Sequence, residues 1–167
     1  MRGHLTHRYL IALGSNVRHA RYGGPREVLA AAIEALGGAG LTIEALSPTL
    51  TSAPLGPSRR RYANAAAIVA TEREPEALLE VLQAIERAFG RRPRGARWRA
   101  RVLDLDIVLW SGGPWASERL IIPHPEFRRR TFVLTPASAI APHWRDAVTG
   151  RTVRHLTARL TRAKPLP

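Results

Sequence analysis

Apolar residues are distributed along the chain in two patterns, short continuous runs and helical stripes. The runs are rich in Leu, Val, Ile and Ala and are typical of buried strands. In the stripes, apolar residues recur three and four positions apart, which predicts two helices that begin at Pro25 and Pro75 and end near Gly37 and Gly90. The expected strands cover residues 8–13, 41–50, 62–71 and 102–110.

These elements follow one another in the order βαββαβ. The order is that of the ferredoxin-like arrangement, in which an antiparallel sheet carries both helices on one face. We therefore expect an α+β fold with a ferredoxin-like core. Nothing in the chain marks a second domain, so we expect a single domain over residues 1–167, with residues 1–8 as a flexible N-terminal extension.

The last third of the chain shows a looser pattern, which predicts a C-terminal extension of the core. Its elements are a turn at 112–114, a short apolar segment at 120–122, helical turns over 131–140 around Pro136, and a final helix with Val153, Leu156 and Leu160 on one face.

Composition excludes several classes of protein. The 167 residues include no cysteine, so disulfides, thiolate metal sites and cysteine nucleophiles are ruled out. No apolar run approaches the roughly 20 residues needed to cross a bilayer, and the segment after the basic N-terminus is too short for a signal peptide. We expect a cytoplasmic protein without a membrane partner.

The formal net charge of +13 suggests a polyanionic partner. Almost all of the excess is arginine, and Lys164 is the only lysine. An arginine bias accompanied by abundant alanine and glycine also arises in GC-rich genomes. The charge is therefore weak evidence for nucleic-acid binding, which we do not expect, although it would attract a nucleoside triphosphate at long range.

Two carboxylates, Asp104 and Asp106, interrupt the apolar run at 102–110. Burial of an unpaired carboxylate costs several kcal/mol, so this pair requires cations. Side chains two positions apart on a strand share a face, with backbones about 6.6 Å apart, and can reach one or two divalent metal ions. The preceding segment is rich in arginine, which suits polyphosphate. The pattern indicates a phosphoryl-transfer site. The arginines concerned are Arg91, Arg92, Arg94, Arg97 and Arg99.

A structural alternative is that Asp104 and Asp106 form surface ion pairs with arginines. Such pairs are common and contribute little to stability. The neighbouring positions are apolar, however, and indicate a strand that is covered on at least one face.

Several short motifs, taken in order over about residues 9–142, resemble the 6-hydroxymethyl-7,8-dihydropterin pyrophosphokinase family of folate biosynthesis. Each motif alone is weak, but the ordered set is specific. The matching residues are Ala12-Leu13-Gly14-Ser15-Asn16, Pro54-Leu55-Gly56-Pro57, Tyr62-Ala63-Asn64, Ile85-Glu86, Gly90-Arg91, Arg97-Trp98, Arg101-Val102-Leu103-Asp104-Leu105-Asp106, Pro123-His124-Pro125, Arg130 and Phe132-Val133-Leu134.

The resemblance implies transfer of pyrophosphate from ATP to the hydroxymethyl group of the pterin, with release of AMP. It implies two magnesium ions on Asp104 and Asp106, with Arg91 and Arg101 as catalytic arginines that neutralise charge on the phosphates. The positions that match ATP-binding residues are Glu86, Trp98, Ile107, His124 and Arg130. The positions that match pterin-binding residues are Leu55, Tyr62, Asn64 and Phe132.

Two other functions are compatible with parts of the pattern. A ferredoxin-like RNA-binding module would explain the charge, but it should carry aromatics on its central strands, whereas residues 65–70 contain none. A two-metal nuclease would explain the carboxylates and arginines, but not aromatic and amide groups suited to a small heterocycle.

Overall fold

The structure is a computed structural model and describes residues 4–52, 61–90 and 102–162. Its main sheet has five strands, in the order β2-β4-β1-β5, and β3 pairs with β4 beside β2. All of these pairs are antiparallel. The strands are β1 (His7–Ser15), β2 (Thr42–Leu46), β3 (Leu50–Ser52), β4 (Tyr62–Thr71) and β5 (Asp104–Trp110).

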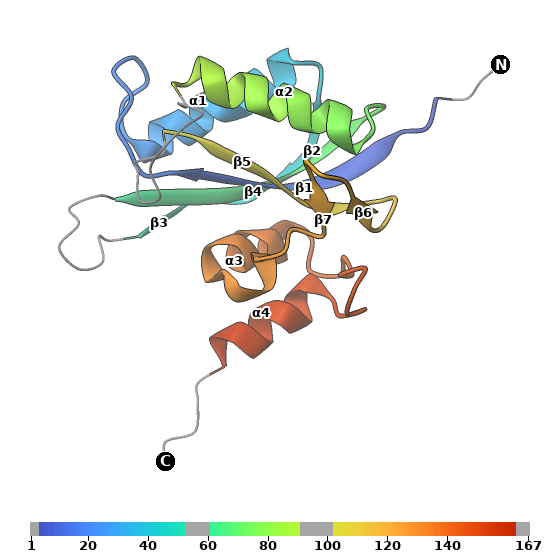
Figure 1. Ribbon diagram of the computed structural model, residues 1–167. Coiled ribbons are helices and arrows are strands. Elements are labelled where there is room, and N and C mark those ends of the chain that lie inside the picture. Colours follow the sequence, from blue (N-terminus) through green and yellow to red (C-terminus); the bar gives the residue numbers. More distant parts are fainter. Residues whose placement is uncertain (1–3, 53–60, 91–101, 163–167) are drawn as a thin grey trace.

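Helices cover both faces of the sheet (Figure 1). On one face lie α1 (Pro25–Gly38) and α2 (Pro75–Ala88), and on the other lie α3 (Thr131–Ile140) and α4 (Val153–Thr161). The α+β fold is confirmed, and the βαββαβ order is compatible with a ferredoxin-like core. The C-terminal extension is the layer formed by α3 and α4.

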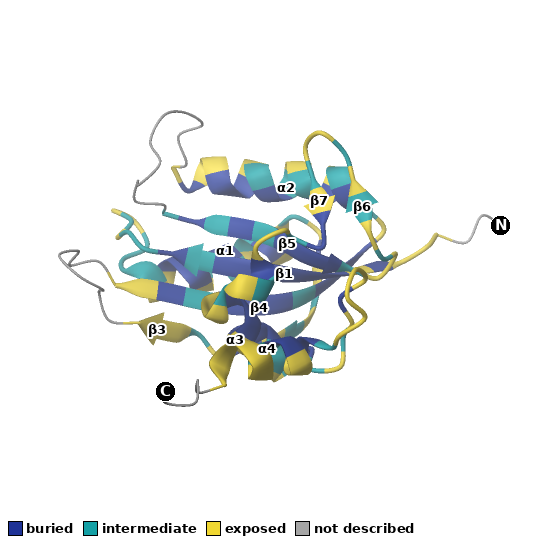
Figure 2. Ribbon diagram, turned by 60° about the horizontal axis from the view of Figure 1, so that its bottom comes forward, coloured by how far each residue is buried: buried dark blue, intermediate teal, exposed yellow. Residues whose placement is uncertain are grey.

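A hydrophobic core lies on each face of the sheet, and alternating side chains of β1 contribute to both cores. Tyr9 and Ile11 are fully buried beneath α1 and α2, whereas Leu10 and Ala12 pack with α3 and α4. Figure 2 shows this central strand buried on both sides, with exposed residues gathered on the outer surfaces of the helices. Because successive strand side chains point to opposite faces, each position of the sheet belongs to one core or the other.

The segment predicted as one strand over 41–50 is two strands in the structure. Residues 47–49, which begin with Ser47 and Pro48, separate β2 from β3. The Ser47 hydroxyl accepts a hydrogen bond from Ala66 N at 2.9 Å and donates one to Pro48 O at 3.0 Å. Pro48 has no amide hydrogen to donate, so the ladder is interrupted there.

The N-terminal boundary also differs from the expectation. Strand β1 begins at His7, inside the expected extension, and runs to Ser15, two residues beyond the end of the expected strand. His7 is buried and accepts a hydrogen bond from Trp110 Nε1 at 3.2 Å. Arg8 pairs with Glu44, Nε to Oε1, at 2.6 Å. These contacts hold the start of β1 in the sheet.

A small hairpin that the sequence did not predict follows the main sheet. Strands β6 (Trp115–Ala116) and β7 (Ile121–Ile122) pair with each other. A single 3-10 turn (Phe127–Arg129) then leads directly into α3.

Candidate active site

The two carboxylates of β5 lie on one face of the sheet, as the sequence predicted. Leu105 and Ile107 point into the core beneath α1 and α2, whereas Asp104 and Asp106 are half-buried at the alternate positions. The carboxylates therefore lie on the same face as α3.

Register places an amide beside this carboxylate pair. Gly14 of β1 is paired with Asn64 of β4 on one side and with Asp104 of β5 on the other. Two residues earlier on β1, Ala12 is paired with Ala66 of β4 on one side and with Asp106 of β5 on the other. The residues between the carboxylates and the amide are small, so no large side chain of β1 stands between them.

Gly14 leaves little room for a side chain. A β-carbon at Gly14 would lie 3.2 Å from Asn64 Oδ1, which is closer than most real contacts of such an atom. The Asn64 side chain therefore lies over the glycine. The sequence drew attention to Gly14 as part of a family motif but not to its contact with Asn64, because that neighbour is 50 positions away.

His124 is held against β5 by its backbone. Its amide donates to Val108 O at 3.0 Å, and its Nδ1 accepts from Glu126 N at 3.1 Å. With Nδ1 accepting, the neutral ring carries its proton on Nε2. Burial lowers the pKa of His124, and the nearby Arg130 lowers it further, although the carboxylates of Asp106 and Glu126 oppose this. The site thus contains a neutral N–H donor near Asp106.

Arg130 and Phe132 lie at the start of α3. Arg130 is the N-cap residue, and its guanidinium carbon is 5.7 Å from the centre of the Phe132 ring. Phe132 is 48% exposed and Tyr62, at the start of β4, is 36% exposed. Exposed aromatics flanking a polar surface are suited to a flat heterocycle.

Glu86 occupies a structural position. It is 2% exposed, and its Oε2 accepts a hydrogen bond from Leu105 N at 3.2 Å. Leu105 lies between the two carboxylates on β5, the edge strand of the main sheet. Glu86 is therefore not an ordinary surface glutamate, because it ties α2 to the backbone that presents Asp104 and Asp106.

The remaining site predictions divide into two groups. The side chain of Ile107 is 3% exposed and packs beneath α1 and α2, so it points away from the carboxylate face and only its backbone can contact a nucleotide. The other predicted residues lie outside the described part of the chain; they are Leu55, Arg91, Trp98 and Arg101.

Sequence reasoning missed Asp146. Its carboxylate is fully buried and pairs with Arg128, Oδ2 to Nε at 2.5 Å and Oδ1 to Nη2 at 2.7 Å. No local pattern marks this residue, because its partner is 18 positions away and the intervening segment is helical. A single aspartate near a glycine is usually a turn residue.

The donors present suit magnesium shared with a phosphorylated substrate. Over the described ranges, no group of three or more His, Asp or Glu side chains is placed to hold a metal alone. Magnesium usually binds one or two carboxylates, with water and substrate phosphates completing its shell. Asp104 and Asp106, on one face and flanked by an open surface, fit that requirement.

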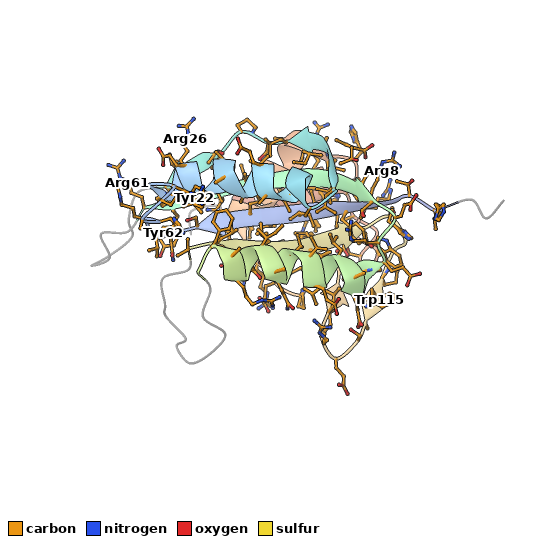
Figure 3. The ribbon with its side chains drawn as sticks, turned by 90° about the horizontal axis from the view of Figure 1, so that it is seen from above. Arg8, Tyr22, Arg26, Arg61, Tyr62 and Trp115 are labelled. Atoms are coloured by element: carbon orange, nitrogen blue, oxygen red, sulfur yellow. The ribbon has the colours of Figure 1, made fainter. Side chains whose placement is uncertain are left out.

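Two surface hollows lie away from these residues. One, of about 530 Å³, is lined by residues that include Thr71 and Arg73. The other, of about 660 Å³, is lined by residues that include Trp115 and Val148. Figure 3 shows Trp115 and Tyr62 near opposite ends of the sheet. Neither hollow includes a predicted site residue, so the site is assigned by register and side-chain chemistry.

The helices of the described segments include none that is both long and apolar enough to span a membrane.

Comparison with known proteins identifies the family. The family model for 7,8-dihydro-6-hydroxymethylpterin-pyrophosphokinase (HPPK) matches residues 10–142. The 2-amino-4-hydroxy-6-hydroxymethyldihydropteridine pyrophosphokinase of Methylorubrum extorquens is 39% identical over 158 residues, covering 93% of this chain and 94% of that protein. The protein of the same name from Pseudomonas aeruginosa is 40% identical over 143 residues, covering 84% of this chain and 85% of its own length.

Solved structures support the fold. A crystal structure of Plasmodium falciparum HPPK-DHPS superimposes with a TM-score of 0.69 at 13% identity, covering 95% of this chain. This chain spans less than half of that longer protein, 45% of its length. The likeness covers nearly the whole chain, and the sequence relatives match it over most of their length. The chain therefore belongs to the 7,8-dihydro-6-hydroxymethylpterin-pyrophosphokinase family.

Proposed function

We propose that this chain transfers pyrophosphate from ATP to the hydroxymethyl group of 6-hydroxymethyl-7,8-dihydropterin on the sheet face that carries Asp104 and Asp106. Its family makes it a pyrophosphokinase of folate biosynthesis with ATP as co-substrate. The observation that supports this location best is the register that sets Asp104 and Asn64 on either side of Gly14. It brings the carboxylate that would bind metal and the amide that would bind the pterin onto one surface.

Asp104 and Asp106 would hold the magnesium ions, of which the resemblance implies two. Bound there, the metal would neutralise charge on the triphosphate and lower the proton affinity of the attacking hydroxyl. The chain contributes by fixing the two carboxylates. Leu105 lies between them in the core, and Glu86 holds the Leu105 amide, so the backbone that carries both ligands is restrained from two sides.

The nucleotide would bind with its phosphates toward His124 and Arg130. The neutral Nε2–H of His124 would donate to a phosphate oxygen, and the Arg130 guanidinium would supply positive charge and directed donors. Neither group needs to gain or lose a proton. In the reaction, the hydroxymethyl oxygen bonds to the β-phosphorus and gives up its proton to solvent, the bridge to the α-phosphate breaks, and AMP leaves with the bridging oxygen.

The pterin would bind between Tyr62, Phe132 and Asn64. The exposed rings offer faces for a flat heterocycle, and the Asn64 amide offers one donor group and one acceptor for its polar edge. Because Asn64 and Asp104 share a row of the sheet, a pterin held by the amide would present its hydroxymethyl group toward the carboxylates.

Product analysis would test this function. The protein is mixed with ATP, magnesium and 6-hydroxymethyl-7,8-dihydropterin, and nucleotides and pterins are separated over time. We expect AMP and pterin diphosphate to form in equal amounts, whereas ADP would contradict pyrophosphate transfer. Asp106→Asn should abolish both products. Glu44→Gln, which breaks the Arg8 ion pair at the opposite end of the sheet, should retain them.

The alternatives of an RNA-binding module and a two-metal nuclease are not favoured, because the curated relatives at about 40% identity are named pyrophosphokinases. Dependence on ATP supports a cytoplasmic location.

A further inference from the structure

Asp146 is a buried carboxylate, and each of its two oxygens accepts two hydrogen bonds. Besides the two bonds from Arg128, it accepts hydrogen bonds from Val148 N at 3.0 Å and Thr149 Oγ1 at 2.7 Å. Burial raises the pKa of Asp146, but the hydrogen bonds outweigh this and bring it to about 2. The carboxylate is therefore charged at any physiological pH. It lies beyond residues 10–142, the segment that the family model matches.

The partner of Asp146 belongs to the turn that joins two predicted ATP-binding residues. Arg128 lies between His124 and Arg130, and its guanidinium carbon is 4.8 Å from the centre of the buried Phe127 ring. Phe127 N donates to His124 O at 3.3 Å, and Arg130 N donates to Phe127 O at 3.3 Å. Phe127 is thus bonded to both residues, and the Asp146 ion pair holds the arginine that covers its ring.

The ion pair also holds Arg128 in a different place from Arg130, two positions along the chain. Arg128 extends toward the hollow lined by Trp115 and Val148, whereas Arg130 lies over Phe132. Without Asp146, Arg128 would be an uncompensated cation two positions from Arg130. The guanidinium would lose the partner that fixes its position over the Phe127 ring.

We propose that Asp146 is a positioning residue for nucleotide binding, which acts through Arg128 to hold His124 and Arg130 in place for the ATP phosphates. The proposal rests on the proposed function of those two residues. A buried ion pair is poor evidence for stability, since apolar replacements of both partners are often neutral or better. The need to hold the turn between His124 and Arg130 in place explains why Arg128 and Asp146 form an ion pair where two apolar residues could have packed.

Steady-state kinetics with each substrate varied in turn would test the proposal. In Asp146→Asn the KM for ATP should rise about tenfold, because misplacement by a fraction of an ångström weakens several charge-assisted bonds at once. The KM for the pterin should rise less than that for ATP, since Tyr62 and Asn64 belong to β4 and only Phe132 of the proposed pterin-binding residues lies beside the turn. Arg128→Met should have a similar effect on ATP. The double variant Arg128→Met/Asp146→Asn should be no worse than either single variant.

Two controls separate positioning from general destabilisation. Leu156→Ala removes apolar packing between α4 and α3 and substitutes neither partner of the pair, and Glu44→Gln breaks another arginine pair far from the turn. Both should keep the wild-type KM for ATP. An unchanged KM for ATP in Asp146→Asn, or the same rise in Leu156→Ala, would overturn the proposal. Failure of the wild-type protein to form AMP and pterin diphosphate would instead overturn the proposed function, and this proposal with it.

Discussion

Replacement of Gly14 by alanine is the sharpest perturbation of the predicted pterin site. Among the described residues outside its own chain neighbours, the new β-carbon would meet one atom within 4 Å, Asn64 Oδ1 at 3.2 Å. Ordinary contacts begin at 3.4 Å, so the Asn64 amide must move by a few tenths of an ångström. Asp104, on the other side of Gly14, is not contacted and keeps its place.

Two opposing effects leave the stability of Gly14→Ala nearly unchanged. Removing a glycine from a strand interior stabilises the fold by about 0.5–1 kcal/mol, whereas a modest overpacked contact costs about 1 kcal/mol. The net change in unfolding free energy should be below about 1 kcal/mol. A displaced Asn64 weakens one hydrogen bond to the pterin, worth about 1–1.5 kcal/mol, which corresponds to a rise of about tenfold in the pterin KM.

The assay varies the pterin at saturating ATP. Gly37→Ala is a matched control, because a β-carbon at that helix position meets nothing within 4 Å; it should leave both KM values unchanged. Combining Gly14→Ala with Asn64→Ala should be no worse than Asn64→Ala alone, since the displaced amide is then absent. A wild-type pterin KM in Gly14→Ala, or additive losses in the double variant, would refute the assignment of Asn64 to the pterin.

Three further predictions address the charges. Asp104→Asn should lower kcat by a factor of about 10³ or more with little change in melting temperature, and loss of melting temperature with retained kcat would contradict a metal role. Because the pKa of Asp146 falls from 3.8 to about 2 on folding, its ionisation contributes about 2 kcal/mol of stability above about pH 4, which is lost as the pH falls toward 2. Urea unfolding of wild type and Asp146→Asn should therefore give curves that converge in acid, and a constant difference would contradict the ion pair. Because burial lowers the pKa of His124 from 6.5, wild type and His124→Gln should show parallel pH profiles between about pH 7 and 8, and a step present only in wild type would show that His124 titrates there.

Much of the fold was predictable because its elements carry local signals. Pro25 and Pro75 begin the two helices, as expected, and strand β4 runs from Tyr62 to Thr71, as expected. The break between β2 and β3 had a local signal in Pro48, which cannot donate to the ladder. The hydrogen bond from Ala66 N to the Ser47 hydroxyl was not predictable, because Ala66 lies on another strand.

The candidate site likewise has features that could be predicted from the sequence and features that could not. Asp104 and Asp106 were identified because their shared face follows from the two-residue repeat of one strand. The burial of Glu86 and the Asp146 ion pair depend on contacts with residues 19 and 18 positions away. Local periodicity contains no information on such pairs, so only the assembled fold reveals them.

The alternation of acidic and apolar residues along β5 also disfavours pairing of β5 with β1 in the wrong register during folding. A slip of one residue against β1 would turn Asp104 and Asp106 into the core and expose Leu105 and Ile107. Each misplaced carboxylate would cost several kcal/mol, and the Leu105 amide would lose Glu86. The two aspartates therefore discriminate against the wrong strand pairing before any substrate is present, and a chain that folds in the correct register has already assembled its metal ligands.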